Sequence, residues 1–96
     1  MRLDVLTSTR DGRRPLAGPQ FDAQAAIATL TPQQTRVFDL LGDGLSNKAI
    51  ARILDLEEVT IKAHLRAIRE KLRCDNRVQV ALISYGHRHF RNHAQS

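Results

Sequence analysis

The stretch Ser46–Leu72, SNKAIARILDLEEVTIKAHLRAIREKL, decides the fold of this chain. Its first part, NKAIARIL, follows a serine that can cap a helix. Its last part repeats apolar residues at steps of four, three and four, namely Ile61, Leu65, Ile68 and Leu72. This spacing places them on one face of a helix. The three residues DLE separate the two helices, so the stretch predicts a helix-turn-helix.

The second of these helices, expected over residues 58–72, carries positive charge away from its apolar face. Lys62 and Arg66 are four residues apart and share a face, with the small Ala63 beside them. In a helix-turn-helix the second helix enters the major groove of DNA. There Lys or Arg donates to guanine, and an Ala methyl touches the methyl of thymine. We therefore predict that Lys62, Ala63 and Arg66 contact bases.

Contacts to DNA phosphates are predicted around this helix. Asn47 and Lys48 begin the preceding helix, where free backbone N–H groups and the helix dipole favour an anion. Thr60 offers a hydroxyl, and His64 is expected to bond backbone or phosphate where the domain meets DNA. Such contacts fix register without reading sequence. The predicted phosphate-contacting set is Asn47, Lys48, Thr60, His64, Arg69, Arg73 and Arg77.

The charge distribution agrees with a polyanionic partner. The 96 residues have a net charge of +5, and residues 59–96 contain eight Lys and Arg against two Asp and Glu. A basic half of this kind suggests a surface for a polyanion. Together with the helix-turn-helix pattern, it makes double-stranded DNA the expected partner. The alternative is a solvated helix face followed by a basic tail, which has the same composition.

Capping signals predict two further helices. Thr31, Pro32 and Gln34 form a capping box for a helix that ends at the glycines of GDG. Asn76 and Gln79 repeat the box before a final helix that is expected to end near residue 86. Because no strand-like alternation persists, we expect an all-α domain of four helices.

The predicted domain covers residues 30–87. Residues 1–29 are expected to be a linker or flexible arm, in which FDAQAAIATL forms either a short helix or a docked extended strand. Residues 88–96 are expected to be a polar C-terminal tail.

The final helix is more apolar than the last helix of a lone domain needs to be. We predict that part of it forms a homodimer interface; the alternative is that all of it belongs to the core. The predicted interface residues are Val78, Val80, Leu82, Ile83 and Tyr85. Because dimers of helix-turn-helix proteins read paired half-sites, the expected DNA site is two-fold symmetric.

The composition and motifs argue against several other classes of protein. Cys74 is the single cysteine, so no disulfide or cysteine-rich zinc site can form within the chain, and we expect a loop residue rather than a redox sensor. His87, His89 and His93 match no metal-binding spacing. With no nucleophile–base pair and no glycine-rich phosphate loop, we expect neither catalysis nor a cofactor. No apolar stretch approaches the length of a membrane span, and a cytoplasmic location is expected.

The segment Leu30–Ile83 resembles the LuxR-type (NarL/FixJ-like) helix-turn-helix domain of bacterial transcription regulators. The resemblance rests on LTP, GLSNKAIA, TIKAHL, KL and NR, and TPQQ, TIKAH and NRVQ favour the response-regulator branch. It implies four helices, of which the third reads the major groove through Lys62, Ala63 and Arg66 and the fourth mediates dimerisation. Since residues 1–29 are too short for a receiver or acyl-homoserine-lactone-binding domain, we expect a truncated regulator or a naturally short one.

Three residues depart from the family pattern. Gln34 replaces an acidic residue but still completes the cap, and Asp55 replaces a glycine of the turn but tolerates the left-handed conformation. Glu57 replaces a capping serine, and its carboxylate would repel a nearby phosphate. Glu57 therefore favours an alternative function, a protein-interaction module that binds RNA polymerase or sequesters another regulator. A sigma-factor promoter-binding region is a weaker alternative, against which NR after KL argues.

Overall fold

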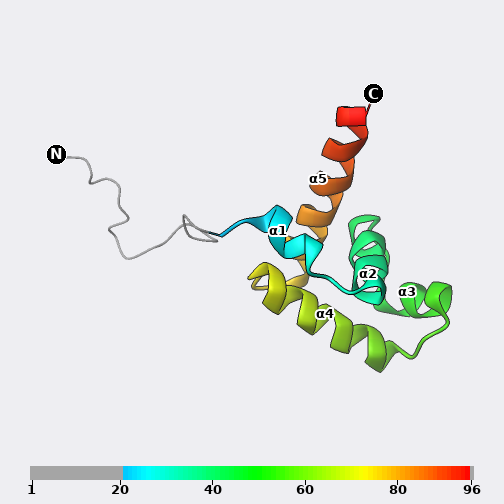
Figure 1. Ribbon diagram of the computed structural model, residues 1–96. Helices are drawn as coiled ribbons and strands as arrows, with labels where there is room; N and C mark the ends of the chain where they lie inside the picture. Colours follow the sequence, from blue (N-terminus) through cyan, green and yellow to red (C-terminus); the bar gives the residue numbers. More distant parts are fainter. Residues whose placement is uncertain (1–20, 96) are drawn as a thin grey trace.

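The computed structural model describes residues 21–95, with side chains described as far as residue 90. This part of the chain forms five helices and no strand: α1 (Ala23–Ala28), α2 (Pro32–Gly42), α3 (Asn47–Leu54), α4 (Glu58–Leu72) and α5 (Arg77–Gln95). The all-α class is confirmed, and α2–α5 are the four expected helices. Figure 1 shows that α5 projects beyond the other helices toward its C-terminal end.

Local capping explains where α2 and α3 begin. Thr31 Oγ1 accepts a hydrogen bond from the Gln34 N–H, and Gln34 Oε1 accepts one from the Thr31 N–H, each at 3.1 Å. The predicted capping box is thus complete. Ser46 Oγ accepts from the Ala49 N–H at 3.1 Å and caps α3 as expected.

α5 differs from its prediction at both ends. Asn76 Oδ1 accepts from the Gln79 N–H at 2.9 Å, as expected, but Gln79 Oε1 accepts from the N–H of Asp75. At the other end, the helix continues through Gly86, which does not have the positive φ that often ends a helix. Residues 88–95 are therefore helical, and the prediction that the helix ends near residue 86 is wrong.

The core is aliphatic apart from Phe38 and Cys74, and most of it comes from α2, α3, α4 and α5. Fully burying a side chain of this kind contributes about 1.5–3 kcal/mol relative to leaving it exposed. The buried apolar residues are Leu30, Val37, Phe38, Leu41, Ile50, Ala51, Ile61, Ile68, Leu72, Cys74 and Val80.

α2 and α5 approach closely where Gly42 meets Ser84. Ser84 is fully buried, and its hydroxyl donates to the Phe38 carbonyl oxygen at 2.6 Å. A Cβ at position 42 would collide with Ser84 Oγ and would lie 2.9 Å from Ser84 Cβ and 3.0 Å from the backbone nitrogen of Tyr85. Glycine is therefore required for this helix contact.

α1 packs against α4. Ile27 lies against the core, and Lys71 Nζ donates to the Thr29 carbonyl oxygen at 3.0 Å. The Arg73 guanidinium lies 4.6 Å from the centroid of the Phe21 ring, a cation–π contact. So short a helix is marginal by itself, so these contacts account for its presence.

Residues 21–29 therefore belong to the folded unit and not to the arm predicted over residues 1–29. Of the two conformations left open for FDAQAAIATL, the structure has the short helix. Residues 1–20 of the predicted arm lie outside the described residues, as does residue 96.

Candidate nucleic-acid interface

The turn between α3 and α4 fixes the position of α4. Asp55 ends α3 in the left-handed conformation, with φ 58° and ψ 49°. The Leu56 N–H then donates to the Ala51 carbonyl oxygen at 2.9 Å, the closing pattern of many helix C-termini. The expectation that Asp55 tolerates the left-handed conformation of this turn is confirmed. Ile61 and Ile68 of α4 are fully buried, so the opposite side of α4 faces outward.

That outward side presents the three predicted base-contacting residues together. Lys62, Ala63 and Arg66 are exposed and, with Val59, line a surface hollow of about 280 Å³. We call these four residues the α4 reading surface. Two cationic side chains and two small apolar side chains lie together there. Base edges in the major groove offer matching partners, namely hydrogen-bond acceptors and the thymine methyl.

Val59 is the member of the reading surface that the sequence reasoning missed. Its side chain is 71% exposed. It lies three residues before Lys62 and four before Ala63, and residues at these spacings share a helix face. The spacing alone therefore indicates that Val59 shares a face with Lys62 and Ala63. It is easily overlooked because valine is more often a core residue.

The N-terminus of α3 holds two of the predicted phosphate-contacting residues, and a third is tied to it. Lys48 is exposed and Asn47 is half-buried. Arg77, at the start of α5, donates to Asn47 Oδ1 and, at 2.6 Å, to the Leu45 carbonyl oxygen. Because Oδ1 of Asn47 accepts from Arg77, the Nδ2 amide group of Asn47 is the part left to donate to a phosphate.

The other predicted phosphate-contacting residues are distributed along α4 and its end. Thr60 and His64 are half-buried. Arg69 Nη2 donates to the Asp75 carbonyl oxygen at 2.6 Å, and the Arg73 guanidinium lies over the ring of Phe21, just ahead of α1. Arg69 and Arg73 therefore make contacts within the fold. They lie toward the C-terminal end of α4, whereas the reading surface lies toward its N-terminal end.

Glu57 occupies the N-cap position of α4 without capping it. Its backbone has the extended conformation of a cap, with φ −78° and ψ 150°, but its side chain makes no capping hydrogen bond. The shorter side chains of Thr31 and Ser46 make such bonds at α2 and α3. Glu57 is exposed, so it adds negative charge at the end of α4 that carries the reading surface.

Cys74 is buried behind the C-terminus of α4, with 8% of its surface exposed. Burial raises the pKa of its thiol, and the Asp75 carboxylate raises it further, while Arg69 acts in the opposite direction. A thiol with a raised pKa forms little thiolate at neutral pH. The environment of Cys74 is therefore that of a structural residue.

The described residues hold no group of three or more His, Cys, Asp or Glu side chains placed to bind a metal ion. None of α1–α5 has both the length and the apolar character that a membrane crossing requires.

α5 divides the predicted dimer residues between two environments. Val80 is fully buried in the core, so its assignment to a dimer interface is wrong, and Ile83 packs partly against that core. Val78, Leu82 and Tyr85 are 63%, 66% and 56% exposed. These three are spaced by four and three residues, so they form one stripe, whereas Val80 points elsewhere because successive helix residues turn by about 100°.

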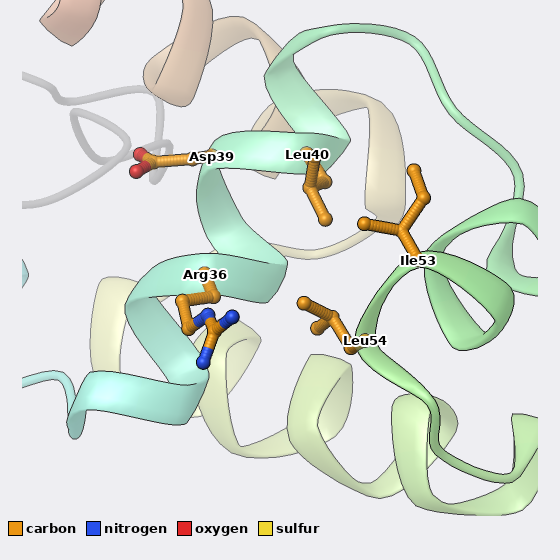
Figure 2. A pocket seen from close by; sticks show the side chains of 5 residues that line it. All are labelled: Arg36, Asp39, Leu40, Ile53 and Leu54. Carbon is orange, nitrogen blue, oxygen red and sulfur yellow. The ribbon is translucent and has the colours of Figure 1, made fainter.

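A second hollow, of about 270 Å³, lies between α2 and α3. Figure 2 shows the apolar side chains of Leu40, Ile53 and Leu54 pointing toward one another from the two helices, while Asp39 points away from them. Arg36 completes the lining. Since the lining residues belong to α2 and α3, this hollow is separate from the α4 reading surface.

The fold and the reading surface define a class of protein, the helix-turn-helix DNA-binding domains. Residues 28–84 match the family described as "Bacterial regulatory proteins, luxR family". The chain belongs to this family and is a DNA-binding domain of the kind found in its transcriptional regulators.

Several regulators are similar to this chain over more than half of its length. The Glycerol metabolism activator of Pseudomonas putida is 40% identical over 82 residues, which cover 85% of this chain and 37% of the relative. The Nitrate/nitrite response regulator protein NarL of Escherichia coli is 38% identical over 56 residues, 58% of this chain and 26% of the relative. The chain thus spans between about a quarter and somewhat more than a third of the length of these relatives.

Proposed function

We propose that this chain binds a two-fold-symmetric site in double-stranded DNA as a homodimer, with α4 in the major groove, as part of a bacterial transcription regulator. The observation that carries the proposal is the α4 reading surface, which is exposed while Ile61 and Ile68 hold the helix from behind. This activity needs no catalytic step and no cofactor, and it places the chain with the DNA in the bacterial cytoplasm.

Within this proposal, Lys62 and Arg66 donate to guanine O6 and N7, and Ala63 lets α4 approach the bases closely. Phosphate contacts from Asn47, Lys48, Thr60 and His64 orient the domain, with Arg69, Arg73 and Arg77 adding positive charge around them. Because such contacts release counterions from DNA, the affinity should fall steeply as salt increases.

The exposed stripe of α5 supports the homodimer. Val78, Leu82 and Tyr85 place apolar surface on one side of the helix, and His89 stacks on Tyr85 with a centroid distance of 5.1 Å and an interplanar angle of 17°. A two-fold axis through this stripe brings it into contact with the same stripe of a second copy of the chain. It also gives two α4 helices related by symmetry, as paired half-sites require.

A relative named a response regulator suggests how the activity is used. We infer that this chain delivers the DNA-binding step of a regulator of the response-regulator branch, under the control of another domain.

Selection from random duplex DNA at about 0.15 M salt tests the proposal. Enrichment of a two-fold-symmetric site supports a dimeric reader of sequence. Binding without enrichment contradicts sequence-specific recognition, and a single unrepeated half-site contradicts the homodimer.

The second candidate function is protein interaction, through RNA polymerase or another regulator. It is favoured by the uncapped, exposed Glu57 and by the hollow beside Ile53, a side chain 57% exposed. Retention of RNA polymerase by the immobilised chain, together with failure to retain any duplex or heparin, would support this function over the first.

A further inference from the structure

Val59 stands out on the α4 reading surface because it is a branched apolar side chain held 71% exposed at the start of a recognition helix. Single exposed apolar residues are common on protein surfaces. Val59, however, lines one hollow together with Ala63, Lys62 and Arg66. In helix-turn-helix proteins the N-terminal residues of this helix contact base edges, and Val59 lies in the first turn of α4.

The major-groove edges of the bases present one apolar group, the C5 methyl of thymine. The methyl groups of Val59 and Ala63 can surround it, whereas neither side chain can accept a hydrogen bond from the amino group of cytosine or adenine. The neighbouring Lys62 and Arg66 carry donors that match O6 and N7 of guanine.

We propose that Val59 is a specificity-determining residue that, with Ala63, reads the methyl of a thymine flanked by guanine in each half-site. The assignment deepens the proposed function and rests on it. It adds Val59, an apolar residue one helical turn before Lys62 and Ala63, to the predicted base-contacting set.

Thymine and deoxyuridine differ only in the C5 methyl, so they test the assignment directly. Each thymine of the selected site is replaced in turn by deoxyuridine, and binding of the whole chain is measured by fluorescence anisotropy. At one thymine position per half-site, removal of the methyl should weaken binding of the chain to the duplex about fourfold, the effect of one buried methyl group. The Val59→Ala variant should show a clearly smaller deoxyuridine penalty at that position, because only Ala63 still contacts the methyl.

Phe90→Ala is the matched control, because Phe90 is 72% exposed and lies on α5. It should keep the full deoxyuridine penalty, and circular dichroism should show both variants folded. An enriched site with no methyl-sensitive thymine, or with a penalty that Val59→Ala leaves unchanged, would overturn the Val59 assignment alone. Failure to enrich any sequence would overturn the assignment together with the proposed function.

Discussion

Arg77 and Asn47, thirty residues apart in the chain, are joined by a hydrogen bond from the Arg77 guanidinium to Asn47 Oδ1. The same guanidinium also donates to the Leu45 carbonyl oxygen. The start of α5 thereby fixes the start of α3, where a phosphate is expected to bind. We therefore expect Arg77 to act on DNA binding in part through the position of Asn47.

Arg77→Ala should lower the unfolding free energy by about 1–3 kcal/mol, because it leaves partly buried acceptors without their donor. It should also weaken binding to all duplexes in similar proportion, since phosphate contacts carry no sequence information. Urea denaturation and fluorescence anisotropy measure the two effects. Arg77→Lys keeps the charge but not the paired donors, so full recovery of affinity by lysine would show that charge alone matters.

Gly42→Ala should destabilise the fold by about 1–3 kcal/mol, because the added methyl overpacks the contact between α2 and α5. Gly86→Ala is the matched control. A Cβ at position 86 meets nothing within 4 Å, so alanine should stabilise α5 by about 0.5–1 kcal/mol. Thermal unfolding of both variants checks the prediction, and equal melting temperatures would contradict the described helix crossing.

Glu57→Ser should stabilise the domain by about 0.5–2 kcal/mol, because serine can cap α4 where glutamate does not. It should also strengthen DNA binding by removing a negative charge from that end of α4. Glu57→Gln separates the two effects, since it removes the charge without adding a short cap. If glutamine stabilised the fold as much as serine, the capping explanation would fail.

Lys62→Ala and Arg66→Ala should each reduce discrimination at particular base pairs by about 1–3 kcal/mol. Lys48→Ala should instead weaken all duplexes alike and reduce the slope of log affinity against log salt by about one. Binding of the selected site and its single-base variants over a range of salt separates the two patterns. Uniform weakening by Lys62→Ala would contradict its role in base reading.

Leu82→Glu should convert the proposed homodimer to a monomer, because it places a charge in the middle of the apolar stripe on α5. Leu82 is 66% exposed, so the fold should survive. Sedimentation of the chain with and without a symmetric duplex measures the change. A sedimentation coefficient for the variant equal to that of the unchanged chain, with DNA bound, would contradict the proposed interface.

Sequence patterns predicted best those features that depend on neighbours along the chain. The Thr31 and Ser46 caps are confirmed, because capping involves residues three apart. The shared face of Lys62, Ala63 and Arg66 follows from helical spacing in the same way, although their contacts with DNA remain predictions.

Features that depend on packing between distant segments were missed. Val80 was assigned to a dimer interface because the last helix is apolar on several sides, and only its packing against the core shows which side is inward. Local spacing does not decide between helix and strand for α1, because the stability of α1 comes from contacts with Lys71 and Arg73. The bond between Arg77 and Asn47 joins helices whose proximity no local pattern reveals.

The docking of α1 also determines where another domain can be joined to this one in a chimeric regulator. Phe21 leads into α1 beside Arg73, which by helical rise lies about 21 Å along α4 from Val59. A junction placed at Leu30, where the sequence resemblance begins, would remove α1 and expose the surface it covers. A junction ahead of Phe21 keeps that surface covered and lets a transplanted module enter at the end of α4 remote from Val59.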